Sequence, residues 1–250
     1  MNSHYKIGFL LIHGLGSNCT VMSPLEDFLT NKGFEVLNIT LPGHNTSSKD
    51  LLKIDWQDWV DYCQGKLELL MGDCSTTFIV GTSLGGVLAL YLAAINPELS
   101  GVITCATAVK PYNFLSWFIV NFRFIHYFVR WIKIEKISSK LIGDPQNWEA
   151  YKKIPVKSLV EIAKLLDKLN PILGNISQPI LIVHSENDRA VSIKGIEQIT
   201  SSISSSDQHI VRLSKGGHVI MLDEGCTQAL TEIENWIDVR ISKIDFNLFN

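Results

Sequence analysis

Short apolar segments alternate with longer amphipathic ones along most of the chain. The short segments are nearly continuous runs rich in valine and isoleucine, which is typical of strands buried on both faces of a parallel sheet. Strand–helix alternation of this kind predicts an α/β fold with a mostly parallel central sheet flanked by helices. The predicted strands are Lys6–Ile12, Phe34–Ile39, Thr77–Gly81, Gly101–Ala106, Ile180–His184 and His209–Leu213.

The longer segments have the periodicity and end signals of helices. The predicted helices are Ser23–Asn31, Asp55–Met71, Gly85–Ile95, Ile193–Ile203 and Cys226–Ile241. Gly85–Ile95 is apolar on all sides, which predicts a buried helix. At the start of the first helix, Ser23, Pro24 and Glu26 match a capping box with Ser23 as the N-cap.

The alternation stops between Lys110 and Pro171, where about 60 residues contain no convincing strand. This length is too great for a simple loop. We therefore expect a single domain over residues 1–250, with a small helical cap inserted at 110–171 on the carboxyl edge of the sheet.

Aromatic and basic residues are concentrated in this insert. Residues 110–140 carry six Lys or Arg and one acid, Glu135. On a helical wheel Arg123, His126, Arg130 and Lys133 form one stripe, opposite Phe114, Trp117, Phe118, Ile125, Phe128 and Ile132. Three interpretations stay open: contact of residues 112–136 with an anionic membrane, a lid lining an acyl site, or a helix that only packs on the body.

Composition excludes several classes of protein. The 250 residues are 46% hydrophobic and 19% charged with a net charge of −3, which argues against disorder and against a nucleic-acid-binding protein. The five cysteines form no CxxC pair, so neither a disulfide framework nor a zinc site is indicated, and a reducing cytoplasm is expected. No apolar run is long enough for a signal peptide or a membrane span.

A serine lies on a glycine-rich turn between a predicted strand and the buried helix. The turn reads GTSLGG from Gly81 to Gly86, a G-x-S-x-G pattern in the strand–turn–helix context that it requires. Side chains flanking so tight a turn would collide with neighbouring elements, and the helix N-terminus favours negative charge. We interpret Ser83 as a nucleophile; the alternative is a plain strand–helix turn.

A serine hydroxyl is a weak nucleophile and needs a base, which an acid must orient. His218 follows the last strand and precedes the last helix, at the edge where α/β sheets bind their ligands. For the acid, Asp188 is favoured over Glu186 in the loop after Ile180–His184. Structural roles are expected for His13, His44, His184 and His209.

The oxyanion formed by attack on a carbonyl needs two backbone N–H donors. Leu84, the residue after the serine, would supply one. The loop after the first strand, His13–Ser17, would supply the other through Leu15, because Gly14 and Gly16 let the backbone curl towards the serine.

These motifs resemble the α/β-hydrolase superfamily, and more narrowly its small bacterial carboxylesterases and monoacylglycerol lipases. The likeness covers most of the chain, through HGLGSN, LPGH, GTSLGG, IPVKSLVEIAKLL, SENDRAV and GGHVIMLDE. It implies an α/β-hydrolase fold with a small cap and no metal or cofactor. It also implies Ser83 as nucleophile, Asp188 as acid, His218 as base, and Leu15 and Leu84 as oxyanion donors. The first loop reads HGLGS where the family often has HGFTG, which leaves the shape of the acyl site open.

The expected function is hydrolysis of a small carboxylic ester with an acyl chain, through an acyl-enzyme intermediate. A thioesterase or acyltransferase on the same triad, or a non-catalytic ligand-binding protein, remains the alternative. Dehalogenases and epoxide hydrolases of this fold have aspartate at the position of Ser83, so they are disfavoured. The expected location is cytoplasmic, with peripheral membrane contact through the insert.

Overall fold

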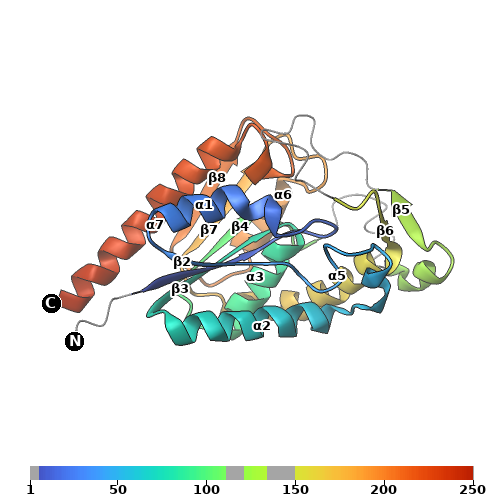
Figure 1. Cartoon of the computed structure of the whole chain (residues 1–250), viewed down its shortest axis with the longest axis horizontal. Coiled ribbons are helices and arrows are strands. Elements are labelled where there is room, and N and C mark those ends of the chain that lie inside the picture. Colours follow the sequence, from blue (N-terminus) through green and yellow to red (C-terminus); the bar gives the residue numbers. More distant parts are fainter. Residues whose placement is uncertain (1–5, 111–120, 134–149, 250) are drawn as a thin grey trace.

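A six-stranded, fully parallel sheet forms the centre of the molecule (Figure 1). The computed structural model describes residues 6–110, 121–133 and 150–249, with side chains of the last helix described as far as Ser242. The strand order is β2-β1-β3-β4-β7-β8. All six predicted strands are confirmed to within one residue at each end: β1 Ile7–Ile12, β2 Glu35–Ile39, β3 Thr76–Thr82, β4 Gly101–Cys105, β7 Ile180–Ser185 and β8 Gln208–Leu213.

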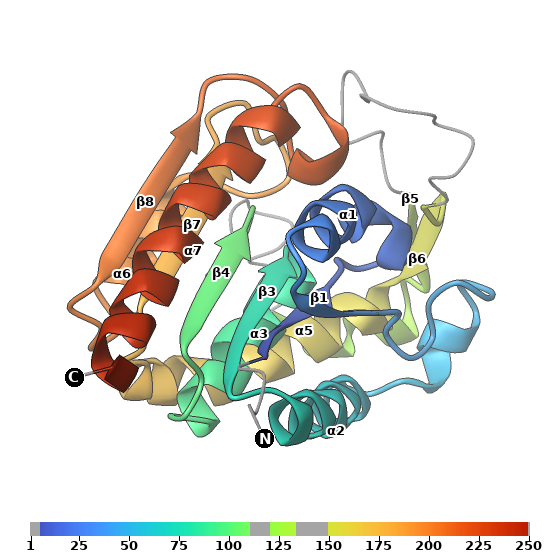
Figure 2. The same ribbon diagram turned by 60° about the vertical axis from the view of Figure 1, so that its left-hand side comes forward.

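Helices cover both faces of the sheet, as the apolar strands require (Figure 2). In β1, Phe9 and Leu11 join the core on one face, while Leu10 and Ile12 join the core on the other. The first face is covered by α1 Ser23–Asn31 and α7 Cys226–Phe249. The other is covered by α2 Trp56–Asp73, α3 Leu84–Ile95, α5 Val156–Leu169 and α6 Lys194–Thr200. α3 is buried along nearly its whole length, as its composition predicts.

The capping box predicted at Ser23 is wrong. Ser23 has helical backbone angles, because a 3-10 helix, η1 Cys19–Met22, runs directly into α1. The N-cap of α1 is Met22, which makes no side-chain cap; the side-chain cap lies at the start of η1, where Asn18 accepts the Thr20 N–H at 2.9 Å. The Glu26 carboxylate instead accepts a hydrogen bond from the Asn38 amide at 2.6 Å, so it fixes α1 to β2.

The insert combines a small sheet with helices. Its described part contains η3 Arg123–Tyr127, β5 Trp131–Lys133, β6 Lys153–Pro155, α5 and η5 Asn170–Asn175. β5 and β6 pair antiparallel, so the expectation of an insert without strands is wrong. Arg123, His126, Arg130 and Lys133 therefore do not share one helix. Phe114, Trp117 and Phe118 lie outside the described residues.

Residues 121–133 of the insert pack on α5. Ile125 and Ile132 contact Val156 and Val160, and the Arg123 guanidinium pairs with the Asp167 carboxylate of α5 at 2.5 Å. Two further 3-10 helices, η2 Asp50–Lys53 and η6 Ile220–Leu222, lie in loops of the body. Within the described ranges, no helix combines the length and apolar character that crossing a bilayer requires.

Candidate active site

Ser83 lies on the sharp turn between β3 and α3. Its backbone has φ 54° and ψ −115°, a strained conformation for a residue with a side chain. The turn is possible because a Cβ on Gly81 would lie 2.0 Å from the carbonyl oxygen of Gly85, and one on Gly85 would lie 2.1 Å from that of Ile12. The Ser83 N–H is fixed by a 2.9 Å hydrogen bond to the carbonyl of Cys105, at the end of β4.

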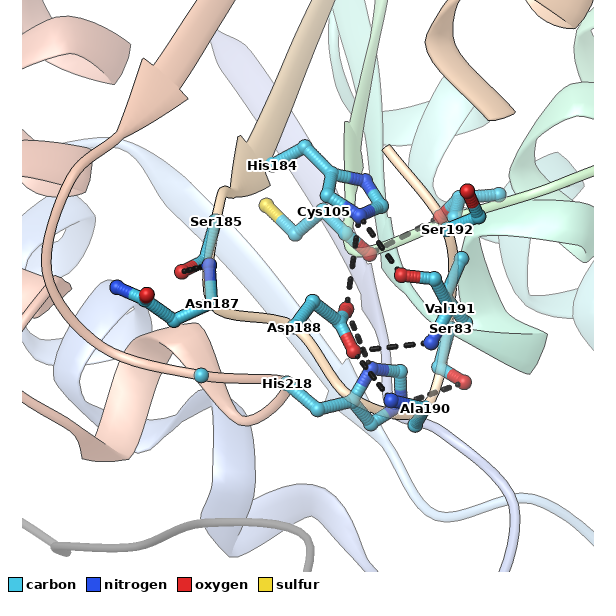
Figure 3. Close-up of polar contacts among 12 residues, drawn as sticks. Ser83, Cys105, His184, Ser185, Asn187, Asp188, Ala190, Val191, Ser192 and His218 are labelled. Carbon is cyan, nitrogen blue, oxygen red and sulfur yellow. Dashed lines mark hydrogen bonds and ion pairs between the residues drawn. The ribbon is translucent and has the colours of Figure 1, made fainter. Parts of the chain in front are cut away.

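The structure brings Ser83, His218 and Asp188 together in one hydrogen-bonded row (Figure 3). His218 Nε2 lies 3.1 Å from Ser83 Oγ, and His218 Nδ1 lies 2.8 Å from Asp188 Oδ2. In the neutral tautomer that fits this row, Nδ1–H donates to the carboxylate and the Nε2 lone pair accepts the serine proton. The three residues come from the carboxyl ends of β3, β7 and β8.

Asp188 is held as a carboxylate. Its other oxygen, Oδ1, accepts the N–H groups of Ala190 at 2.7 Å and Val191 at 2.9 Å. Burial alone would raise the pKa of Asp188, but the hydrogen bond and charge of His218 and these two N–H donors outweigh burial and lower it. Glu186, the competing candidate, has an exposed side chain with no hydrogen bond to His218 among the described residues.

The loop that carries His218 is held by groups that sequence reasoning missed. The buried Asp223 carboxylate accepts the Gly217 N–H at 2.5 Å and the Gly225 N–H at 2.9 Å. Ser185 Oγ donates to the Gly216 carbonyl at 2.7 Å, which connects the Asp188 loop to the His218 loop. Asp223 was visible in the GGHVIMLDE motif, but nothing in the sequence indicated which N–H groups it would bind.

The first loop lies against the serine. A Cβ on Gly14 would be 3.1 Å from Ser83 Cβ, so the two backbones approach closely. The Leu15 N–H has no acceptor among the described residues. Leu84 is the first residue of α3, where an N–H has no helical carbonyl to bind. Within the described part of the chain, neither N–H therefore has an acceptor; Leu84 follows Ser83 directly, and Leu15 follows Gly14 in the loop packed against it.

Other titratable groups near the site are structural. His184 is fully buried, donates from Nε2 to the Val191 carbonyl at 3.2 Å and lies 3.6 Å from Asp188 Oδ2. Burial lowers its pKa, which keeps the ring neutral. Burial raises the pKa of the Cys105 thiol to about 12, so this neighbour of Ser83 is no competing nucleophile. The described ranges contain no cluster of His, Cys, Asp and Glu suited to a metal ion.

His13 and His44 have the structural roles that were predicted for them. His13 Nε2 accepts the Leu41 N–H at 3.0 Å, and its Nδ1–H donates to the Gly14 carbonyl at 2.8 Å. The hydrogen bond accepted at Nε2 requires a neutral ring. Burial, followed by repulsion from His44, lowers the pKa of His13 to about 3. Burial likewise lowers the pKa of His44 to about 4.

These two lowered pKa values make stability depend on pH. In the unfolded chain both imidazoles take up protons below about pH 6.5, whereas in the folded chain they do not. Their contribution is therefore present above that pH and is lost as the pH falls. Between pH 6.5 and 5 we expect the free energy of unfolding to drop by on the order of 3 kcal/mol, measured by urea denaturation. NMR titration showing that either ring protonates near pH 6.5 would contradict this.

Comparison with known proteins shows the family to which the chain belongs. The family model described as serine aminopeptidase, S33, matches residues 4–225. A thermostable monoacylglycerol lipase from Bacillus sp. (strain H-257) is 31% identical over 217 residues, covering 87% of this chain and 84% of the relative. A monoacylglycerol lipase from Mycolicibacterium smegmatis is 23% identical over 242 residues, covering 91% and 86%.

Solved structures show the same fold. One from a study of the metagenome-derived lipolytic enzymes LipS and LipT has a TM-score of 0.84 at 23% identity, covering 93% of this chain and 94% of that one. A soluble variant of monoglyceride lipase from Saccharomyces cerevisiae, in complex with a substrate analog, has a TM-score of 0.76 at 18% identity, covering 96% and 89%. The chain thus has the α/β-hydrolase fold and belongs to the serine aminopeptidase S33 family.

Proposed function

We propose that this enzyme hydrolyses small carboxylic esters that carry an acyl chain, in the manner of a monoacylglycerol lipase. The observation that carries the proposal is the row from Ser83 Oγ through the His218 ring to the Asp188 carboxylate, with contacts of 3.1 Å and 2.8 Å. The 31% identical relative, a monoacylglycerol lipase, supports an ester as the substrate. We assign the insert at 110–171 as the cap over this site.

The reaction proceeds in two steps. Ser83 Oγ attacks the ester carbonyl while His218 Nε2 takes its proton, and Asp188 stabilises the imidazolium that forms. His218 then gives the proton to the leaving alcohol, and the acyl group stays on Ser83. In the second step His218 takes a proton from water, the resulting hydroxide attacks the acyl carbon, and the proton returns to Ser83 as the acid leaves.

Two backbone N–H groups stabilise the tetrahedral intermediates in this proposal. Leu84 N–H points from the first turn of α3, where the helix dipole also favours negative charge. Leu15 N–H comes from the loop packed against Ser83. Losing one donor of this type typically costs about 3–4 kcal/mol of activation free energy.

Replacing the nucleophile tests the central assignment. We expect Ser83→Ala to lower ester turnover by roughly 10⁶-fold while the chain stays folded. A fluorophosphonate probe should label the wild-type chain stoichiometrically and the variant not at all, as measured by intact mass. Near-normal hydrolysis by Ser83→Ala would refute the assignment. Parallel assays on a thioester and an amide with the same acyl group would show which of the three bonds is cleaved best.

The acid is tested by a matched pair of variants in one loop. Asp188→Asn should lower kcat by roughly 10⁴-fold, because the amide no longer favours the productive tautomer or stabilises the imidazolium. Glu186→Gln, two residues away and exposed, should keep kcat within about twofold of wild type. The reverse ranking of the two variants would transfer the role to Glu186.

The cap also has an exposed apolar tip, made of four aromatic side chains and one valine. We define the tip as Phe122, Phe124, Tyr127, Phe128 and Val129. Phe128 is 80% exposed and Phe124 58% exposed, unlike most large apolar side chains of the chain. Beside the tip, the register places Lys133 directly opposite Lys153. Like charges in cross-strand register destabilise a sheet unless an anion neutralises them. We therefore propose that the tip inserts into an anionic membrane surface.

Vesicle co-sedimentation tests this contact. The wild-type chain should bind phosphatidylglycerol vesicles at low salt. Phe124→Ser with Phe128→Ser should weaken binding by at least about tenfold, because two buried rings are lost. Leu69→Ser is the matched control, since Leu69 is 64% exposed on α2 and outside the tip. Equal binding by all three proteins, or none by the wild type, would contradict membrane contact.

The cysteines bear on the location of the protein. All five are free thiols, which supports a location in the reducing cytoplasm.

A further inference from the structure

Tyr151 connects the cap to two loops of the body beside the candidate site. Its backbone N–H donates to the Gly16 carbonyl at 2.8 Å. Its hydroxyl donates to the Gly43 carbonyl at 3.0 Å and accepts the Thr46 N–H at 3.2 Å. Tyr151 lies two residues before β6 and is separated from these partners by more than 100 residues in sequence.

The Tyr151 ring continues this connection through two imidazoles. It lies nearly parallel to the His44 ring, with an interplanar angle of 10° and centroids 6.3 Å apart. His44 in turn meets the His13 ring edge-on at 5.0 Å. His13 Nδ1–H then binds the Gly14 carbonyl at 2.8 Å. Packed rings thus run without interruption from the cap to the loop that contacts Ser83.

These contacts fix the peptide group before Leu15 and the peptide group after Gly16. The Gly14 carbonyl and the Leu15 N–H belong to one planar trans peptide, so they point in opposite directions. The Gly14 oxygen is held by His13 and by the Ser17 hydroxyl, which donates to it at 2.9 Å. The Gly16 oxygen is held by Tyr151 N–H. Holding the Gly14 oxygen sets the direction of the Leu15 N–H, and holding the Gly16 oxygen restrains the other end of the same short loop.

We propose that Tyr151 is a positioning residue through which the seated cap aligns the Leu15 N–H with the oxyanion. The inference rests on the proposed function, in which Leu15 is an oxyanion donor. Tyr151 itself touches no reacting atom. Its loss would leave the triad intact and allow the first loop to shift, which weakens stabilisation of the transition state more than binding of the ester.

The test compares Tyr151→Phe and Tyr151→Ala with Tyr62→Phe in the full-length chain. Tyr151→Phe keeps the ring and the backbone hydrogen bond and removes only the hydroxyl contacts. Tyr62, a half-buried tyrosine of α2 whose ring contacts Lys66, is the matched control. The readouts are kcat and KM on a butyrate ester, the inhibition constant of a trifluoromethyl ketone, and the melting temperature. This ketone forms a tetrahedral adduct with serine whose oxyanion needs the same donors.

We expect kcat to fall about fivefold in Tyr151→Phe and about 30-fold in Tyr151→Ala, with KM within twofold of wild type. These losses are smaller than the 10²- to 10³-fold loss typical of removing a donor outright. The inhibition constant of the ketone should rise in parallel with the loss of kcat/KM. Tyr62→Phe should behave as wild type.

Other outcomes overturn the inference. A rise in KM at constant kcat would show that Tyr151 only shapes substrate access. An unchanged inhibition constant, or a lowered melting temperature with wild-type kcat, would show a merely structural role. Wild-type kcat in both Tyr151 variants of an active enzyme would overturn this inference and leave the proposed function standing. A wild-type chain that hydrolyses no ester would overturn both.

Discussion

The close approach of β3, α3 and β1 at Ser83 is the constraint on which the rest of the site depends. Ser83 has a left-handed backbone that costs on the order of 1–3 kcal/mol, and the turn closes only because Gly81 and Gly85 have no side chains. Both flanking elements are almost wholly buried, and this burial offsets the strain. The same core therefore determines the fold and holds the serine hydroxyl at the edge of the sheet.

Around this turn, a polar network holds the His218 and Asp188 loops in register. Asp223 binds the backbone next to His218, and Ser185 joins the Asp188 loop to the same segment. Buried polar groups are costly unless they are paired, so a fully bonded arrangement of these loops is strongly favoured over displaced ones. The His218 imidazole is thus held in one orientation, which is the preorganisation that the proposed acyl transfer requires.

The insert at 110–171, which we propose as the cap, contacts the body on its inner side and is exposed at its tip. Its inner side contacts the first loop through Tyr151, and its exposed tip carries aromatic side chains near two opposed lysines. Within the insert, Arg123 of η3 pairs with Asp167 of α5, and α5 is joined to the body by Lys157, which donates to the Leu52 carbonyl. A cap joined in this way to the oxyanion loop would connect events at a lipid surface to the alignment of the Leu15 N–H.

The sequence by itself determined the six strands and the position of Ser83, because continuous burial and a glycine turn are local signals. It favoured Asp188 as the acid but left Glu186 as an alternative, since two residues of one loop differ mainly in what they face once the loop is folded. The predictions for the N-cap of α1 and for the secondary structure of residues 123–133 were wrong, because η1 and the β5–β6 pairing depend on contacts elsewhere in the chain. Tyr151 gave no signal at all, since its partners lie more than 100 residues away and are brought to it only by the tertiary structure.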